Sequence, residues 1–180
     1  MSEPLTGWDA MWTGPPRPEP RALILTPMAL AGPAAAVCAV ARIAAVVVPV
    51  EVGAVAVLAD PEEHSAHDAA RSLSTAMSGA AVVLLRRGPS EDPAAADIQV
   101  CHYQNGTRTS VAAPGLVLAR LPGELEDLLL GVLDPHAVAG AVDATALSQA
   151  AAMRILATAA RAAKGGPPPA PEEPDGGGAT

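Results

Sequence analysis

The sequence predicts an α/β or α+β fold in which helices pack on a single mixed sheet of about five to seven strands. Half of the 180 residues are hydrophobic, which excludes a chain that is disordered throughout. Short valine-rich segments alternate with alanine-rich segments of helical spacing. Several predicted strands follow one another directly, whereas a doubly wound parallel sheet would place a helix between successive strands.

The chain divides into three parts by composition. Residues 1–20 form a Pro-rich tail, residues 21–164 one globular domain, and residues 165–180 a Gly/Pro-rich acidic tail. Both tails are expected to be disordered, because such segments cannot bury enough apolar surface to offset the entropy of ordering. The tails carry five of the eight net negative charges, so the domain itself is nearly neutral.

The first elements of the domain are predicted from apolar runs and from the density of β-branched residues. We expect a strand at 22–25, a helix from 32 to about 43, and two strands within 45–59. Valine is dense in the last segment, and valine packs better on a pleated sheet than in a helix. That segment is long for one strand and is interrupted by Pro49 and Gly53, so we place a turn near residues 51–53.

A capping motif marks the start of the next helix. The segment Asp60-Pro61-Glu62-Glu63 combines an N-cap Asp, a Pro at the first helical position and a Glu at the third. Small apolar residues then recur at helical spacing until Gly79. A buried strand is expected at 80–85, and Arg86 and Arg87 come directly after it.

Residues 98–111 predict a β-hairpin, because Asn105-Gly106 is the pair that a type I′ turn requires. The register of a two-residue turn pairs Gln104 with Thr107, His102 with Thr109, and Val100 with Val111. We expect one more strand at 116–121. A short amphipathic helix follows, marked by Leu125, Leu128, Leu129 and Val132.

The C-terminal part of the domain is rich in alanine. Asp134-Pro135 repeats the cap-and-proline pattern and starts a long segment that we expect to be helical to about Lys164. Two apolar residues, Leu147 and Ile155, fall off its hydrophobic stripe. We therefore expect a break near Asp143, with the helix buried on two sides or against a partner.

A polar group on the helix after Asp60 is a candidate metal site. His64, His67 and Asp68 stand three and four residues apart, so one helix face could present ligands to a divalent ion. That face also carries Arg71, a cation where the ion would sit. A solvated polar face explains the same residues, and spacing alone does not decide between the two interpretations.

Two further groups are candidates for ligand binding. Arg86 and Arg87, at a strand end, could bind a carboxylate or a phosphate, or could be solvated residues that protect an apolar strand from aggregation. The second group is Cys101, His102 and Tyr103 in the hairpin. Neighbouring strand residues point to opposite faces, so Cys101 and His102 cannot act together as nucleophile and base.

Both tryptophans of the chain lie in the N-terminal tail. Trp8, Met11 and Trp12 would share one face of a single helical turn. Large aromatic side chains in such a tail are typical of an anchor, because they give much contact area for few ordered torsions. The anchor would dock on another protein or on a groove of this chain.

Several classes of function lack their motifs in this sequence. It contains no phosphate loop, no Gly-x-Gly-x-x-Gly, no Gly-x-Ser-x-Gly and no His-Glu-x-x-His, and we expect no cofactor. Basic residues are not clustered, which argues against a nucleic acid partner. The uncharged segment 22–41 has the length of a membrane span, but Pro27, Gly32 and Pro33 interrupt it. The N-terminus is unlike a signal peptide, so we expect a cytoplasmic protein with unpaired cysteines.

Two functions are consistent with these patterns. The first is a non-catalytic, soluble module for protein–protein interaction or regulation. Its partner would be another protein, or a second copy bound through the alanine-rich C-terminal helix. The alternative is a small-molecule-binding protein or enzyme that uses Arg86-Arg87 and the Cys101–Tyr103 strand. The sequence assigns no catalytic residue.

Overall fold

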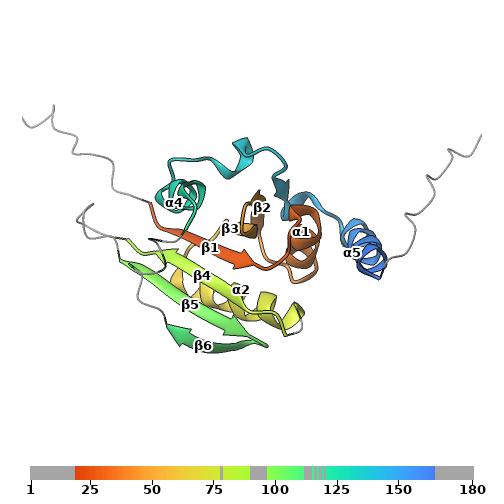
Figure 1. Ribbon diagram of the computed structural model, residues 1–180, viewed down its shortest axis with the longest axis horizontal. Coiled ribbons are helices and arrows are strands. Elements are labelled where there is room, and N and C mark those ends of the chain that lie inside the picture. Colours follow the sequence, from red (N-terminus) through yellow and green to blue (C-terminus); the bar gives the residue numbers. More distant parts are fainter. Residues whose placement is uncertain are drawn as a thin grey trace, which may run out of the picture.

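As the sequence predicts, helices pack on a single sheet of seven strands; the sheet is antiparallel throughout (Figure 1). This computed structural model describes residues 19–77, 79–89, 97–111, 115, 117, 119 and 121–164. The strands are β1 (Arg21–Thr26), β2 (Ala45–Val50), β3 (Gly53–Leu58), β4 (Val82–Arg87), β5 (Ile98–Gln104), β6 (Thr107–Val111) and β7 (Val142–Asp143). Their order in the sheet is β6-β5-β4-β1-β3-β2-β7, and every neighbouring pair is antiparallel.

The centre of the sheet has the topology of a ferredoxin-like unit. Along the chain its elements run β1-α1-β2-β3-α2-β4, and in space the four strands are ordered β4-β1-β3-β2. These are two split β-α-β units that interlock. The β5–β6 hairpin extends this sheet beyond β4, and the short β7 extends it beyond β2.

Helices cover both faces of the sheet. Helices α1 (Ala31–Val40) and α2 (Glu63–Ala76) pack on one face, and α4 (Gly123–Leu130) packs on the other. Helix α5 (Gln149–Ala163) contacts α1 and lies beside it at one end of the molecule (Figure 1). Two short 3₁₀ helices, η1 (Pro135–Ala137) and η2 (Ala144–Ala146), join α4 to α5.

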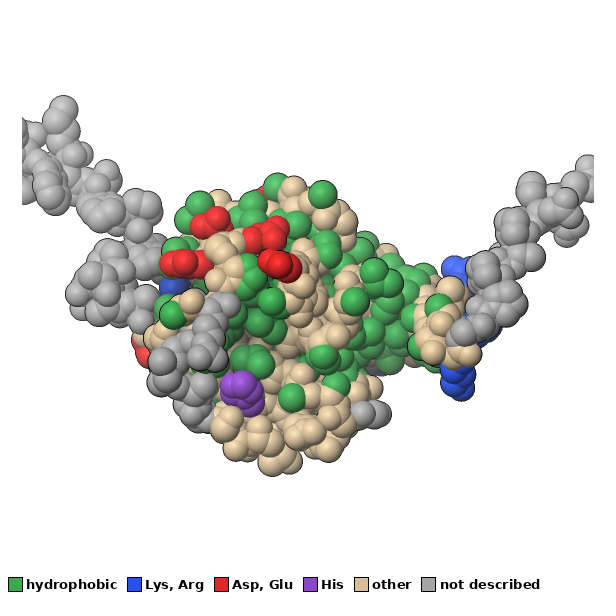
Figure 2. Space-filling view, in the orientation of Figure 1, with side chains coloured by type: hydrophobic (Ala, Val, Ile, Leu, Met, Phe, Trp, Pro, Cys, Tyr) green, Lys and Arg blue, Asp and Glu red, His purple; other side chains and the backbone are tan. Residues whose placement is uncertain are grey.

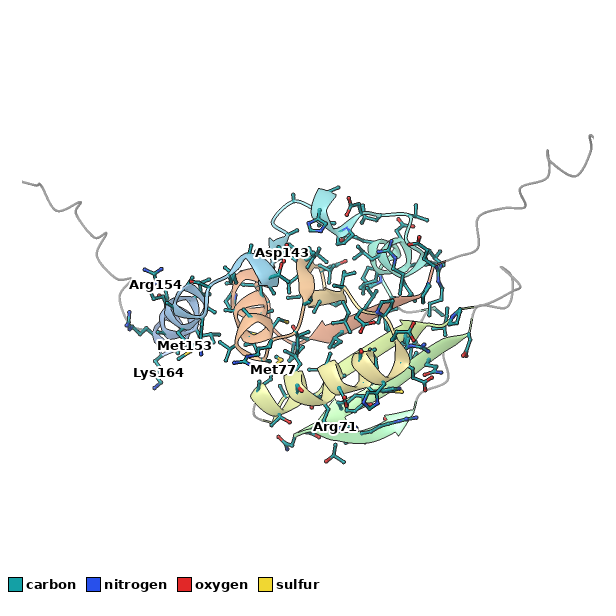
Figure 3. The ribbon with its side chains drawn as sticks, turned by 180° about the vertical axis from the view of Figure 1, so that it is seen from behind. Arg71, Met77, Asp143, Met153, Arg154 and Lys164 are labelled. Atoms are coloured by element: carbon teal, nitrogen blue, oxygen red, sulfur yellow. The ribbon has the colours of Figure 1, made fainter. Side chains whose placement is uncertain are left out.

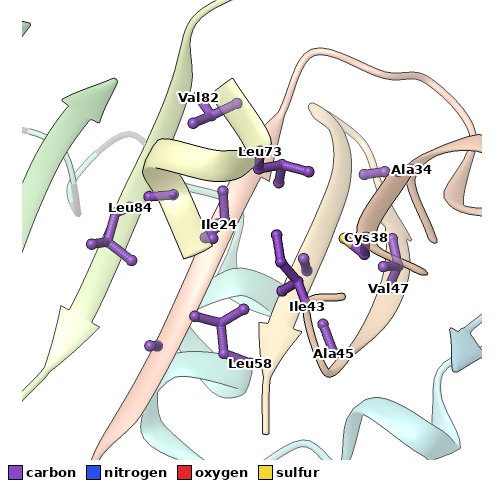
Figure 4. Packing of buried hydrophobic residues seen from close by; sticks show 14 of the residues in the cluster. Ile24, Ala34, Cys38, Ile43, Ala45, Val47, Leu58, Leu73, Val82 and Leu84 are labelled. Carbon is purple, nitrogen blue, oxygen red and sulfur yellow. The ribbon is translucent and has the colours of Figure 1, made fainter. Parts of the chain in front are cut away.

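The core is built from small side chains on the α1–α2 face and larger ones on the α4 face. On the first face Ala34 and Cys38 of α1 pack with Ile24 and Val47 of the sheet (Figure 4). On the other face, leucines of α4 pack on the strand residues that alternate with those of the first face, such as Leu23. This alternation along β1 follows from the strand period of two and shows that the strand is buried on both sides.

The uncharged segment 22–41, which has the length of a membrane span, is divided between two elements of the sheet domain. Residues 22–41 supply most of β1 and all of α1, so no single helix contains them. Within the described part of the chain, every helix is too short or too polar to cross a bilayer.

Two predicted boundaries are wrong by a few residues. Helix α2 begins at Glu63, because Asp60 forms a local turn instead of the N-cap: its Oδ1 accepts a hydrogen bond from the Glu62 backbone N–H at 3.1 Å. Strand β4 continues through Arg86 and Arg87, which pair with β1 and β5.

The hairpin turn is confirmed, but of the three pairs named from the sequence only the one next to the turn is present. Asn105 and Gly106 both have positive φ, as a type I′ turn requires, and Gln104 lies opposite Thr107. A bulge between His102 and Tyr103 then leaves Thr109 as the extra residue, and its hydroxyl donates to the His102 carbonyl at 3.3 Å. His102 therefore lies opposite Ser110, not Thr109, and Cys101, not Val100, lies opposite Val111.

Two longer predictions in the C-terminal half are wrong. In the region predicted as a strand at 116–121, Gly115 and Val117 are helical, and the Ala119 N–H donates to the Gly115 carbonyl. Residues 134–164 do not form a nearly continuous helix either. After η1 the chain turns at Gly140, where φ is +81°, and pairs with β2 before α5 begins.

The break predicted near Asp143 is present and has a local cause. The Asp143 carboxylate accepts hydrogen bonds from the Thr145 backbone N–H and hydroxyl at 2.8 and 2.7 Å, which compete with helical bonding. Ser148 then caps α5, since its Oγ accepts from the Ala151 N–H at 3.2 Å.

Candidate functional site

A hollow of about 550 Å³ lies between α2 and the β5–β6 hairpin. We call it the α2–hairpin cleft. Two groups of residues that the sequence singles out separately meet there, the polar face of α2 and Tyr103 of β5. The lining residues are Glu63, His64, His67, Asp68, Arg71, Tyr103 and Arg108.

A histidine–tyrosine pair forms the floor of the cleft. His67 Nδ1 lies 2.5 Å from the Tyr103 hydroxyl, and the two rings are 6.0 Å apart and tilted. Tyr103 is only 2% exposed, and the side chain of His67 is 14% exposed. Burial, and next the positive charge of Arg108, lower the pKa of His67, whereas burial raises the pKa of Tyr103. Near neutral pH the pair is therefore an uncharged imidazole bonded to an uncharged phenol.

Each carboxylate of the cleft lies within ion-pair distance of an arginine. Asp68 lies 3.1 Å from His64 Nε2 through one oxygen and 2.5 Å from Arg71 through the other. Glu63 is 4.0 Å from His67 Nε2 and 3.9 Å from the guanidinium of Arg86. The contact of Glu63 with Arg86 connects α2 to β4, and the others lie within α2.

The three candidate metal ligands do not converge on one point. His64 is exposed and turned to Asp68, whereas His67 is turned to Tyr103. Across the described ranges, no three His, Cys, Asp or Glu side chains are arranged to hold a metal ion. The interpretation of this helix face as wholly solvated is wrong for His67, because the hairpin covers it.

Arg108 supplies an available charge at the cleft. It lies opposite Tyr103 on β6 and makes no ion pair with any residue that the structure describes. Arg108 is not among the residues that we predict from the sequence as candidates. The sequence does contain a pattern that indicates its position, because a two-residue turn at Asn105-Gly106 pairs Tyr103 with Arg108.

The burial of Arg86 and Arg87 contradicts both interpretations of the pair, as a joint site for an anion and as solvated residues beside the strand. They are 5% and 3% exposed, so they are not solvated residues flanking the strand. They point to opposite faces of β4 and cannot hold one ligand together. Arg86 Nε donates to the Pro61 carbonyl at 3.1 Å. Arg87 donates to the carbonyls of Leu130 and Glu19 at 3.1 and 2.6 Å.

Cys101 and His102 do not line the cleft. Cys101 is buried beneath α2 on the same strand face as Tyr103, and burial raises the pKa of its thiol. His102 is partly buried on the opposite face of β5. Trp8, Met11 and Trp12 lie outside the described residues.

Helix α5 presents a second candidate surface. Ala152 is the only fully buried residue of this helix, and the neighbouring Met153 is 54% exposed. Figure 3 shows Met153, Arg154 and Lys164 on this helix, with the two basic side chains pointing away from α1. Ala152 and Met153 are neighbours in the sequence, but the structure buries the first and exposes the second.

No protein-family model, curated protein or solved structure matches this chain. The ferredoxin-like topology at the centre of the sheet is compatible with many unrelated functions. A function must therefore be argued from the cleft and from the surface of α5.

Proposed function

We propose that this protein is a non-catalytic interaction module that associates with itself through the outer face of α5. The observation that carries the proposal is the position of α5, a helix of 15 residues. Its one extensive contact with another described element is with α1. An isolated helix of this length is only marginally stable in water, so its contacts decide whether it forms. The face turned away from α1 is open to a partner.

The chemistry of the described side chains supports a binding role over catalysis. The cleft pairs each carboxylate with cations and pairs His67 with Tyr103. The thiols of Cys38 and Cys101 are buried, and burial raises the pKa of both. A thiol acts as a nucleophile in its ionised form, so neither cysteine is activated. Two buried free thiols also agree with the cytoplasmic location that we propose.

Self-association through α5 is tested by one substitution and a matched control. Met153→Glu places a charge on the outer face of α5, and Val52→Glu makes the same kind of change at a residue of equal exposure, 54%, in the β2–β3 turn. Sedimentation velocity over a concentration series should show association of the natural chain, loss of it in Met153→Glu and no change in Val52→Glu. A natural chain that is monomeric at millimolar concentration would refute the proposal.

A second candidate function is the binding of a small carboxylate or phosphate in the α2–hairpin cleft. It is favoured by the convergence of Arg71, His67 and Tyr103 with Arg108, whose charge no described carboxylate neutralises. Guanidinium groups bind such anions through paired hydrogen bonds. Calorimetric titration with succinate and with inorganic phosphate tests it. Binding should disappear in Arg108→Gln and persist in Arg154→Gln, a change of the same charge on the remote helix α5.

A further inference from the structure

The outer face of α5 carries basic side chains from Arg154 to the C-cap residue Lys164. At 100° per residue, Arg154, Ala157 and Arg161 lie opposite the buried Ala152, Met153 and Lys164 flank them on one side, and all five are exposed. Residues 149–164 contain no acidic side chain. The surface that faces a partner therefore combines three cations with one flexible apolar side chain.

An acidic surface of matching character lies over α4 and the segment that follows it. Its exposed carboxylates are Glu124, Glu126, Asp127 and Asp134. Leu130 and Val132, which are 40% and 75% exposed, lie within the same stretch. Arg21, packed against Gly131, is a cation beside it. We call this surface the α4 acidic surface, and it pairs four negative charges with two exposed apolar side chains.

The basic and acidic surfaces occupy opposite ends of the molecule. Helices α4 and α5 lie at the two ends of the view in Figure 1, and Figure 2 shows acidic side chains gathered over α4 and basic ones at the far end of α5. The surfaces cannot meet within one copy of the chain. Complementary surfaces at opposite ends can meet between copies.

We infer that the outer face of α5 docks on the α4 acidic surface of a second copy, so that the chain associates head to tail. This inference rests on the proposed function, since it names the partner surface for α5. Complementary charges steer and orient such a contact, and Met153 would meet the exposed Leu130 and Val132 of the other copy. Because the two surfaces differ, one contact leaves an α5 face and an α4 acidic surface free, and repetition of the contact gives a closed ring or an open chain of copies.

A symmetric contact of α5 with α5 is disfavoured by the same charges. It would place Arg154, Arg161 and Lys164 of one copy against the same three cations of the other. Like charges brought together at an interface are destabilising. The acidic partner surface removes this repulsion.

A charge exchange between two variants of the full chain tests the inference. One variant carries Arg154→Glu and Arg161→Glu on α5, and the other carries Glu124→Arg and Asp127→Arg on α4. Each variant alone now presents like charges at the contact and should be monomeric in sedimentation velocity. An equimolar mixture restores opposite charges at every contact, and association should return. For the natural chain, raising NaCl from 50 to 500 mM should weaken association by about tenfold or more.

Several results would overturn the inference. If Met153→Glu abolishes association but the mixture stays monomeric, α5 binds a copy in another way; the head-to-tail contact is wrong and the proposed function stands. If the natural chain never associates, both fail.

Association that appears only when Glu172, Glu173 and Asp175 are made neutral shows that the chain's own acidic segment covers α5. Sedimentation with phosphatidylglycerol vesicles, without self-association, shows that the partner is an anionic lipid surface. Circular dichroism confirms that each variant folds.

Discussion

Truncation of Leu128 measures how much the α4 helix contributes to the core. Leu128 is fully buried in the cluster on the α4 face, together with Leu125 and Leu129. Leu128→Ala removes three carbon atoms, or about 2.4 kcal/mol of transfer free energy at roughly 0.8 kcal/mol per methylene. The cavity that remains adds to this loss, so we expect the free energy of unfolding to fall by about 3 kcal/mol. A domain of this size is stabilised by about 5–15 kcal/mol, so the loss is a large fraction.

Leu130→Ala is the matched control, because it makes the same chemical change at the end of the same helix. Leu130 is 40% exposed and leaves no internal cavity, so we expect a loss of about 1 kcal/mol. Urea denaturation followed by circular dichroism gives both values, and an unchanged m-value shows that the two unfolding reactions are comparable. A difference below about 0.5 kcal/mol between the two variants would refute the assignment of α4 to the core.

Three further predictions concern the turn, the cleft and the thiols. Gly53→Ala should destabilise the protein by about 2 kcal/mol or more, because φ is +136° and a Cβ would lie 2.5 Å from the Thr26 carbonyl oxygen. Stability should fall as the pH drops below 6.5, since the folded state lowers the pKa of His67 and the unfolded chain binds that proton more readily. Cys38, whose pKa burial raises to about 12, and Cys101 should not react with iodoacetamide at pH 8 in the native protein.

Each of these predictions has its own control. Gly32→Ala in α1, where a Cβ meets nothing within 4 Å, should not destabilise the protein. In acid titrations followed by urea unfolding, His67→Gln should flatten the loss of stability below pH 6.5. An unchanged loss of stability in His67→Gln would contradict the role of His67. Mass spectrometry after alkylation should find both thiols modified only in denaturant, and rapid native labelling would show that they are accessible.

Most of the local structure could be predicted because its causes are local. The valine-dense segment on either side of the turn near Glu51–Gly53 forms β2 and β3, and Asn105-Gly106 forms the type I′ turn. Leu125, Leu128 and Leu129 pack α4 on the sheet. In each case nearby side chains restrict the backbone or define one apolar face. The wrong predictions have a different cause. Between Asp134 and Asp143 the alanine-rich sequence suits a helix, but pairing of Val142 with β2 offers the backbone other hydrogen bonds.

The candidate sites could be predicted as groups of residues but not as arrangements. His67 and Tyr103 are 36 residues apart, and only the packing of α2 across β5 brings them into contact. The prediction that Arg86 and Arg87 follow the strand was wrong. In sequence, residues that come after a strand look the same as residues that continue it within the sheet. Their burial depends on carbonyl groups that distant segments supply.

The amino-acid sequence by itself determined the class of fold, the approximate positions of β1 to β6 and the hairpin turn. These features follow from hydrophobic periodicity, turn geometry and charge, which act over a few neighbouring residues. Only the tertiary structure decided the strand order, the burial of the arginines, the contact of His67 with Tyr103 and the separation of acidic and basic surfaces to opposite ends. Those features depend on which distant segments pack together, and the free energy of that packing is shared over the whole sheet and its helices.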